Sequence, residues 1–462
     1  MTTASVESRE PARPDRVIGT YELIGPDEIE RRIVAATRAQ EAWERDAPGR
    51  ARALHAWANA VEARADAFAD LLVREVGKPA RESRGEVARA IAILRYYAQA
   101  AFDPVAEIYP VAEAGAELRV HRRPLGVVAA ICPWNFPIAI PVWKLAPALA
   151  YGNAALFKPS SSALATAHLL MEAADAALPP GVLGLVACAP GSSAALVDDP
   201  RIAGVSFTGS VAVGTDIIGR AVGRGVPAQA EMGGQNPVIV LEDADFEAAA
   251  TMIARAAMEF AGQKCTATRR VIVPAGVAEA FVPILVDAVR GLRVGAPEDE
   301  TVDAGPVISE RARADVEAAL AAARGRGARV LSGGGRPREE GWFIEPSVVA
   351  VDDPADAFAQ EETFGPAISV LVAADVDAAV RIANGTRFGL AAAVYGRDVE
   401  RARAVAMRLD AGMQRVNAPT TGVDFYTPFG GDKSSSFGPR EQGRAAREFY
   451  TTTRTMLTRA TG

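Results

Sequence analysis

The chain is organised around two short stretches, Glu231-Met232-Gly233-Gly234-Gln235-Asn236-Pro237 and Phe260-Ala261-Gly262-Gln263-Lys264-Cys265-Thr266. The first places a carboxylate beside two glycines, and the second places a thiol just after a predicted helix. A thiol can attack a carbonyl carbon, and a carboxylate can later activate water against the acyl intermediate that forms. If the fold brings the two stretches together, they predict covalent catalysis by Cys265 with Glu231 as the base.

Length and composition narrow the possibilities. A chain of 462 residues predicts two or three domains. The net charge of −7 is modest and mixed along the chain, which argues against nucleic-acid binding. Three cysteines do not make a disulfide framework, and three histidines leave little for a metal site, so no metal is expected. We expect a reducing, cytoplasmic compartment and no membrane span. The polar N-terminus up to Arg16 is expected to be a disordered tail.

Hydrophobic periodicity predicts a helical start followed by two α/β regions. Residues 26–101 have apolar side chains at helical spacing, and no catalytic residue is expected there. From residue 125 to residue 240, short apolar runs alternate with helical segments, as in a doubly wound parallel sheet. The strands expected in this region are 127–131, 154–157, 184–187, 205–207 and 238–241, and the helices are 162–177 and 211–222.

A second series of alternating helical segments and apolar strands begins at residue 246, so we expect two α/β domains with a cleft between them. The helices expected in this part are 246–261, 277–289, 310–324, 376–383 and 399–408, and the strands are 271–273, 329–331, 367–372 and 392–394. Between the helical start and the first α/β region, residues 116–121 alternate between apolar and polar residues, which predicts a half-exposed edge strand.

The segment Gly209-Ser210-Val211-Ala212-Val213-Gly214 follows an apolar run and begins a predicted helix. Backbone N–H groups at such a helix start can bind a pyrophosphate, with Ser210 as the cap. The same spacing is also typical of an ordinary tight turn, so the residues alone leave both interpretations open. Taken alone, Lys158 is typical of a solvated strand end. Glu362 and Phe364, taken alone, are typical of a solvated acidic loop that places a phenylalanine in the core.

The two opening stretches resemble the signature motifs of the NAD(P)-dependent aldehyde dehydrogenase superfamily. The similarity extends to five more segments in the family's order, and it covers the chain from about residue 20 to the C-terminus. These segments are Pro133-Trp134-Asn135-Phe136-Pro137, Lys158-Pro159-Ser160, Phe207-Thr208-Gly209-Ser210, Glu362-Thr363-Phe364-Gly365-Pro366 and Pro428-Phe429-Gly430-Gly431.

The resemblance implies an α/β fold with a Rossmann-like cofactor domain, an α/β catalytic domain and a small β bridging element. We expect the cofactor domain at residues 1–107 and 125–231, the catalytic domain at 232–435, and the bridging element at 108–124 and 436–462. In the family this element pairs with a sister subunit, and the strands expected at 116–121 and 450–458 would supply it. A homodimer or homotetramer is therefore expected.

The resemblance also implies the cofactor contacts. Lys158 matches the lysine that binds the adenosine ribose, and Glu362 matches the residue that holds the nicotinamide ribose, with Phe364 near the ring. Ser161 stands where many NAD-preferring relatives carry a glutamate, which would repel a 2′-phosphate, so we predict that NADP is accepted as well as NAD. The other implied cofactor-binding residues are Trp134, Ser160, Gly191, Gly209, Ser210, Gly214 and Gly233.

Cys265 is the predicted nucleophile. A free cysteine is usually a small buried hydrophobe, which suits Cys132 and Cys188, because both lie in or beside apolar runs. Cys265 differs because Lys264 and Arg269 lie near it in the sequence, and cationic neighbours favour the thiolate.

By resemblance, the Asn135 amide and the Cys265 backbone N–H stabilise the oxyanion that forms when the thiol attacks an aldehyde. Hydride transfer to the nicotinamide then leaves a thioester, which Glu231 hydrolyses by activating water. Glu441 matches a second family carboxylate that relays protons, and a plain surface charge is an equally good interpretation of it.

The substrate is expected to be a small semialdehyde. Residues 417–426 and 437–443 look most like the corresponding segments of bacterial α-ketoglutarate semialdehyde (2,5-dioxovalerate) dehydrogenases. A semialdehyde carries a distal carboxylate, which needs an arginine, lysine or hydroxyl partner. The candidates from the sequence are Arg269, Arg270, Thr420 and Thr421.

Three other functions are alternatives to aldehyde oxidation. Transfer of the acyl group to coenzyme A is disfavoured because acylating relatives generally lack the carboxylate found at Glu231. A non-catalytic binding protein of the same fold is disfavoured because the catalytic set is intact. A thiol protease would need a suitable histidine, and His55, His121 and His168 all lie in helix or strand patterns.

Overall fold

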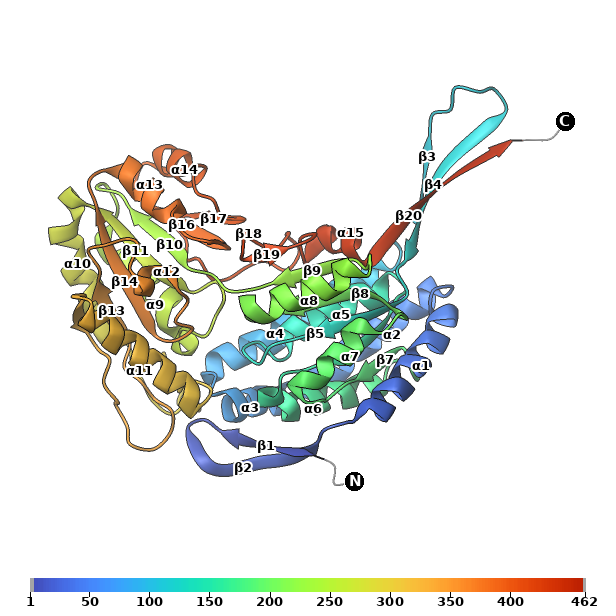
Figure 1. The fold of residues 1–462 in the computed structure, drawn as a ribbon, viewed down its shortest axis with the longest axis horizontal. Coiled ribbons are helices and arrows are strands. Elements are labelled where there is room, and N and C mark those ends of the chain that lie inside the picture. The colour runs from blue at the N-terminus through green and yellow to red at the C-terminus, as the bar shows by residue number, and fades with distance from the viewer. Residues whose placement is uncertain (1–3, 460–462) are drawn as a thin grey trace.

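Two lobes and a projecting arm make up the computed structural model, which describes residues 4–459 (Figure 1). Each lobe has a mainly parallel sheet with helices on both faces, so the predicted α/β fold class is confirmed. The arm is a three-stranded antiparallel sheet in the order β20-β4-β3. Its strands are β3 (Ala106–Tyr109), β4 (Ala116–Pro124) and β20 (Thr451–Arg459), close to the edge strand and companion strand expected from the sequence.

The first lobe is built on a six-stranded sheet in the order β19-β9-β8-β5-β6-β7. Its strands are β5 (Val127–Ile131), β6 (Ala154–Lys158), β7 (Leu183–Leu185), β8 (Ile202–Thr208), β9 (Ala228–Glu231) and the antiparallel β19 (Ser436–Phe437). Its helices are α1 (Pro26–Trp43), α2 (Ala47–Glu62), α3 (Ala65–Val76), α4 (Ala80–Ala100), α5 (Ala139–Ala150), α6 (Leu164–Asp175), α7 (Ser193–Asp198), α8 (Val211–Gly223) and α15 (Ala446–Tyr450). Short 3-10 turns are η1 (Ser161–Ala163), η2 (Pro190–Ser192) and η4 (Gly443–Ala445).

The second lobe is built on a seven-stranded sheet in the order β12-β13-β14-β11-β10-β16-β17. Its strands are β10 (Asn236–Val240), β11 (Thr268–Pro274), β12 (Arg329–Ser332), β13 (Ser347–Ala350), β14 (Ala367–Ala373), β16 (Ala391–Tyr395) and β17 (Met413–Val416). Its helices are α9 (Phe246–Met258), η3 (Glu259–Gly262), α10 (Ala275–Arg290), α11 (Glu310–Gly325), α12 (Ala357–Gln360), α13 (Val376–Asn384) and α14 (Val399–Ala406). A separate pair, β15 (Phe388–Gly389) and β18 (Asp432–Lys433), lies beside it.

The N-terminal segment is not the tail expected from its polar composition. Strands β1 (Ser5–Glu10) and β2 (Arg13–Glu22) form an antiparallel hairpin. Hydrogen bonds hold this hairpin in place: Ser8 Oγ donates to Glu75 Oε1 at 2.7 Å, and the backbone N–H of Trp342 donates to the carbonyl of Pro11 at 2.9 Å. Polar contacts to both lobes hold the hairpin in place. Polar residues are also typical of a disordered tail, so the composition alone did not distinguish the two.

Two more expectations about the sheets need correction. The apolar run near residue 238 was grouped with the first sheet, but β10 lies in the second sheet between β11 and β16. The place beside β8 is taken by β9, whose alternating Ala-Gln-Ala-Glu sequence did not stand out as a buried strand. Helix α5 was also missed, because it contains proline and its residues are buried all round, so its sequence shows no helical period.

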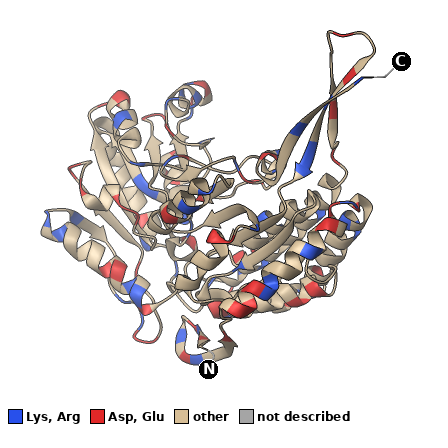
Figure 2. Ribbon diagram, turned by 45° about the vertical axis from the view of Figure 1, so that its right-hand side comes forward, with Lys and Arg blue, Asp and Glu red and all other residues tan. Residues whose placement is uncertain are grey.

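Charged side chains of both signs are interspersed on both lobes and on the arm (Figure 2). Many are paired, as Arg201 is with Glu30 and Asp199. Among the described residues, no helix is long and apolar enough to cross a membrane, and no group of three or more His, Cys, Asp or Glu side chains could hold a metal ion.

Candidate active site

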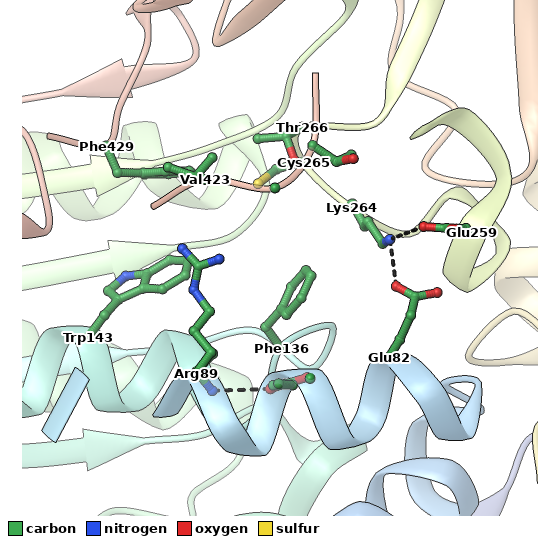
Figure 3. Close-up of a pocket in the computed structure, with 15 residues that line it drawn as sticks. Glu82, Arg89, Phe136, Trp143, Glu259, Lys264, Cys265, Thr266, Val423 and Phe429 are labelled. Carbon is green, nitrogen blue, oxygen red and sulfur yellow. Dashed lines mark hydrogen bonds and ion pairs between the residues drawn. The ribbon is translucent and has the colours of Figure 1, made fainter. Parts of the chain in front are cut away.

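Cys265 lies at a cavity of about 270 Å³ to which both lobes contribute (Figure 3). Helices α4 and α5 supply one side of the cavity, and the loops around Cys265 and Val423 supply the other. This volume is below the range of about 300–1,000 Å³ that is usual for drug-sized ligands, so the cavity suits a small molecule.

A turn with left-handed backbone conformation precedes Cys265 and positions it at this cavity. Phe260 and Ala261 have φ values of 53° and 51°, and Gly262 follows at 67°. A side chain at Gly262 would place its Cβ 2.3 Å from the carbonyl oxygen of Gly365, so only glycine fits. Non-glycine residues in this region cost about 1–3 kcal/mol each, and such strain is concentrated at functional sites.

The structure brings the two opening stretches together. The Asn236 side chain donates to the carbonyls of Cys265 at 2.8 Å and Ala267 at 2.7 Å. Gly234 packs so closely that an added Cβ would lie 2.7 Å from the Cys265 carbonyl oxygen. The carboxylate stretch and the thiol stretch are therefore direct neighbours, as the covalent hypothesis requires.

Glu231 is the last residue of β9 and is buried. Its Oε2 accepts a hydrogen bond from Ser436 Oγ at 2.6 Å. Burial and the nearby Glu441 raise its pKa well above the usual glutamate value, although Ser436 and Lys144 oppose the shift. A carboxyl with a raised pKa can exchange protons near neutral pH, which suits a general base.

Glu441 is also buried, so the alternative of a surface charge is wrong. It forms an ion pair with Lys144, and Trp143 Nε1 donates to its Oε2 at 2.6 Å. Lys144 donates in addition to Ser206 Oγ at 2.9 Å. This buried polar network lies close enough to Glu231 for the two carboxylates to interact electrostatically.

Asn135 lies in the loop between β5 and α5, against the loop that carries Cys265. Its side-chain amide donates to the carbonyl of Gln263 at 2.9 Å. Because the amide has two hydrogens, this bond leaves one of them for another acceptor. Among the described residues, the Asn135 side-chain oxygen has no hydrogen-bond partner.

A buried Lys78–Glu86 ion pair packs against the loop that carries Asn135 and is hydrogen-bonded to its backbone. Lys78 Nζ donates to the backbone carbonyl of Asn135 at 2.8 Å and lies 3.9 Å from the centre of the Phe136 ring. Glu86 Oε1 accepts from the backbone N–H groups at the start of α5, of Ile138 at 3.0 Å and Ala139 at 3.1 Å. The helical start of the chain, where no catalytic contribution was expected, therefore positions Asn135.

The surroundings of the thiol do not lower its pKa, contrary to what its cationic neighbours in the sequence had suggested. Burial, with the carboxylates of Glu362 and Glu231, raises the pKa of Cys265 to about 12. The Lys264 ammonium is engaged with Glu82 at 2.5 Å and Glu259 at 3.5 Å. Arg269 donates to the carbonyls of Gly262 and Gly365. The two cations hold the surrounding loops. The Arg269 charge still acts on the thiolate, as expected, but burial and the two carboxylates outweigh it, so the pKa of the thiol is raised and not lowered.

The predicted cofactor residues follow the carboxyl ends of neighbouring strands in the first sheet, where ligands bind in such folds. Lys158 ends β6 and is buried, with the carbonyl of Pro159 as its partner at 3.2 Å. Ser160 and Ser161 follow, and Ser160 Oγ accepts from the backbone N–H of Ser162 at 3.2 Å. Gly191, after β7, is exposed with open space at its Cα.

The strand β8 leads into the predicted phosphate-binding turn. Ser210 caps α8, with its Oγ accepting from the backbone N–H of Val213 at 3.4 Å. Gly209 donates its N–H to the backbone carbonyl of Glu231 at 3.0 Å, so this turn lies next to the predicted catalytic residue. Gly214 lets α8 pack on Met232, because an added Cβ would lie 2.5 Å from the Met232 sulfur.

Glu362, Phe364 and Trp134 line a second cavity, of about 320 Å³. Glu362 Oε1 accepts from the backbone N–H of Gly234 at 3.1 Å, and an added Cβ on Gly233 would lie 2.3 Å from its other oxygen. The Phe364 and Trp134 rings meet edge to face, with centroids 5.7 Å apart. These residues form the wall between the two lobes.

Three of the four side chains considered for substrate binding point elsewhere. Arg269 binds the two carbonyls described above, and Arg270 donates to the carbonyls of Gln235, Ile382 and Ala383. Thr420 is buried against Thr268. Only Thr421 lines the Cys265 cavity.

Helix α4 supplies cavity residues that sequence reasoning missed. Glu82, Glu86 and Arg89 are spaced so that they share one helix face, and this face lines the cavity. That spacing was visible in the sequence, but it is also the usual pattern of charges on a solvated helix face, so nothing marked it as functional.

A sheet with a capped helix start at its carboxyl edge, next to a thiol, a buried carboxylate and an amide, can combine phosphate binding with covalent chemistry at the thiol. The chain belongs to the aldehyde dehydrogenase family, whose model matches residues 1–456, and it is an enzyme of the aldehyde dehydrogenase class.

Sequence and structure comparisons agree on this family. The chain is 38% identical to the alpha-ketoglutaric semialdehyde dehydrogenase of Bacillus subtilis (strain 168), over 98% of this chain and 94% of that protein. It is 37% identical to the alpha-ketoglutarate semialdehyde dehydrogenase of Haloferax volcanii, over 98% of this chain and 96% of that protein. Among solved structures, it matches a Staphylococcus aureus betaine aldehyde dehydrogenase in complex with NAD+ with a TM-score of 0.95 and 31% identity, over 98% of this chain and 91% of that one.

Proposed function

We propose that the protein oxidises a small aldehyde to the carboxylic acid with NAD(P)+, through a thioester on Cys265. The observation that carries this proposal is the position of Cys265. It lines a cavity of small-molecule size and has the buried carboxylate of Glu231 close enough to perturb its pKa.

In the first step, the Cys265 sulfur forms a bond to the aldehyde carbon and the carbonyl oxygen becomes an oxyanion. Because the pKa of the free thiol is raised to about 12, its proton needs an acceptor as the bond forms, and Glu231 is the suitable carboxylate. The free N–H of the Asn135 amide and the Cys265 backbone N–H are the proposed donors to the oxyanion.

In the second step, the C=O bond re-forms, a hydride leaves the same carbon, and a thioester remains on Cys265. NAD(P)+, when bound, supplies the hydride acceptor. Glu231 first releases the thiol proton to solvent and then takes a proton from a water molecule whose oxygen attacks the thioester. The C–S bond breaks, and the sulfur leaves as the thiol with the proton that Glu231 returns. The sum is aldehyde, water and oxidised cofactor giving acid, reduced cofactor and one proton. A carboxylate beside the thioester supports water as the acyl acceptor over coenzyme A.

The residues at the carboxyl edge of the first sheet fit a dinucleotide. The helix start capped by Ser210 offers backbone N–H groups to a pyrophosphate, and buried Lys158 has hydrogens left for a ribose. Glu362 and Phe364 would hold the nicotinamide end beside Gly233. We propose that NADP is accepted, because the partly exposed Ser161 places a hydroxyl where a glutamate would repel a 2′-phosphate.

We propose a small semialdehyde as the substrate, in line with the names of the two similar proteins above.

We further propose that the first lobe binds the cofactor, that the second lobe carries the nucleophile, and that the arm pairs with a sister subunit. The arm exposes Ile108, Met456 and Leu457, which supports pairing, and light scattering on the purified protein measures the oligomer. The proposed compartment is the cytoplasm, where Cys265 stays reduced.

Replacing the nucleophile tests the function. Cys265→Ala should abolish cofactor reduction across a panel of aldehydes, measured at 340 nm, while Cys188→Ala should retain it. Cys188 is buried and lines neither cavity, so it is a matched control. Undiminished aldehyde oxidation in Cys265→Ala would exclude the proposed chemistry.

A further inference from the structure

Arg89 extends from α4 into the cavity that holds Cys265. Figure 3 shows its guanidinium between Phe136 and Trp143, directed toward the side of the cavity where Cys265 and Val423 lie. Among the described residues, the side chain has no hydrogen bond or ion pair, and its Nε is buried without a partner. A guanidinium has five donors in a fixed fork, and buried donors of this kind normally find acceptors.

The other charged groups around the cavity already have partners. Lys264 is paired with Glu82 and Glu259 (Figure 3). Glu86 is paired with Lys78 and accepts the two backbone N–H groups at the start of α5. The carboxylates whose charge reaches Arg89 are those of Glu86 and Asp424, and neither lies within ion-pair distance of it. Within the described part of the chain, Arg89 is thus the cavity's unpaired cation.

The rest of the wall is mostly apolar. Phe136, Trp143, Val423 and Phe429 line the cavity, and Thr266 and Thr421 add hydroxyls. A ligand that suits this wall has a short hydrocarbon middle, an aldehyde for Cys265 at one end and an anionic group for Arg89 at the other. Aromatic walls would also suit a quaternary ammonium ion, but the charge of Arg89 would repel it.

We propose that Arg89 is the specificity-determining residue of the site and binds the distal carboxylate of a short ω-oxo acid. A carboxylate offers two acceptor oxygens that match the guanidinium fork, which gives a charge-assisted, orienting contact. The inference rests on the proposed function, because it concerns the substrate of the same thiol. Arg89 selects the substrate and takes no part in the chemical steps.

The test compares matched substrates and variants. We expect the protein to oxidise 5-oxopentanoate with a kcat/KM at least about tenfold above that for pentanal, which has the same chain length and no charge. Arg89→Gln should lower kcat/KM for 5-oxopentanoate by about 10- to 150-fold, the usual range for losing a hydrogen bond to a charged group, and leave pentanal within threefold. Arg89→Lys should keep part of the preference. Arg84→Gln, an exposed arginine on the same helix that pairs with Glu300, is the control and should change neither substrate.

A binding measurement without turnover completes the test. Glutarate, a dicarboxylate with no aldehyde to oxidise, should quench Trp143 fluorescence in the wild type and in Cys265→Ala, and bind at least about tenfold more weakly to Arg89→Gln. Equal glutarate binding with and without Arg89, or an Arg89→Gln enzyme that still prefers 5-oxopentanoate, would overturn the inference while aldehyde oxidation stands. If no aldehyde reduces the cofactor at all, the proposed function fails, and this inference fails with it.

Discussion

Replacing Glu231 by glutamine separates the two halves of the proposed reaction. Glutamine has nearly the same shape, and its side-chain oxygen can still accept the hydrogen bond that Ser436 donates at 2.6 Å. Burial raises the pKa of Glu231, so the ionised form destabilises the folded state at pH values above the ordinary glutamate value of about 4.3. Removing that charge should leave the melting temperature at neutral pH unchanged or higher, so a loss of activity will not reflect unfolding.

The size of the effect follows from the role of Glu231. A positioned general base contributes about 100- to 10,000-fold, so steady-state turnover in Glu231→Gln should fall by that factor. If Glu231 acts mainly on the thioester, the first turnover still releases one hydride per site. If it also takes the proton of the Cys265 thiol, whose pKa is raised to about 12, the first turnover slows as well.

Stopped-flow absorbance at 340 nm measures both phases. We expect a burst of reduced cofactor of about one per subunit followed by very slow turnover, and the rate of the burst reports how much Glu231 contributes to thiol attack. In the wild type, kcat should fall as the pH drops through the raised pKa of Glu231, and this fall should occur at a higher pH than an ordinary glutamate would give. The pH–rate profile of the variant should lack this fall. Glu242→Gln, which removes an exposed carboxylate paired with Arg401, is the control. Steady-state turnover in Glu231→Gln within about threefold of wild type would refute the assignment.

Two further substitutions probe the cofactor end and the support of the oxyanion residue. Ser161→Glu should shift the NADP-to-NAD ratio of kcat/KM at least fivefold toward NAD, because the new carboxylate would repel the 2′-phosphate of NADP. Two like charges about 4 Å apart repel by about 1–4 kcal/mol at the dielectric constants of water and of a protein surface. A wild-type enzyme that already prefers NAD by more than about tenfold would count against NADP acceptance. Lys78→Met should lower stability by about 3–5 kcal/mol, since it strands the buried Glu86 carboxylate, and should lower kcat through Asn135. Thermal melting would show the loss of stability. A recovered melting temperature in Lys78→Met/Glu86→Gln would show that the unpaired Glu86 charge caused the loss. An unchanged melting temperature in Lys78→Met would contradict the structural role of the ion pair.

The repeating pattern of strands and helices was predictable because most of the elements carry a strong local signal. The strand at residues 127–131 and the helix that Ser210 caps are a continuous apolar run and an amphipathic segment with a capping residue, and both signals are local. Helix α5 and strand β9 were missed for different reasons. The helix is buried all round, so its sequence shows no helical period. The strand alternates as a strand should, but its four residues are too few, and its alanines too weakly apolar, for the alternation to stand out.

The site was predictable where chemistry restricts the residue type, and unpredictable where electrostatics depends on the fold. The neighbours of Cys265 in the sequence suggested a stabilised thiolate, but the fold directs Lys264 to Glu82 and Glu259. It also buries the sulfur and brings the carboxylates of Glu362 and Glu231 close enough to raise the pKa of the thiol. Sequence proximity says which groups are near a thiol along the chain. It does not say which way their side chains point.

The turn between α3 and α4 shows how much of a site can lie outside its recognisable motifs. In the sequence, Gly77-Lys78-Pro79 looks like a plain helix stop, but in the fold it lies at the contact between the lobes. An added Cβ on Gly77 would lie 2.7 Å from the Pro306 ring, and one on Gly305 would lie 2.2 Å from the Gly77 carbonyl oxygen, so this contact admits only glycine at both positions. Lys78 reaches from the turn to the Asn135 carbonyl, and the Asn135 amide reaches the Gln263 carbonyl two residues before Cys265. Because this chain of contacts runs from one lobe to the other, a shift between the lobes would move the proposed oxyanion donor relative to the thiol. The geometry of the site therefore depends on how the lobes pack as much as on the residues proposed to react.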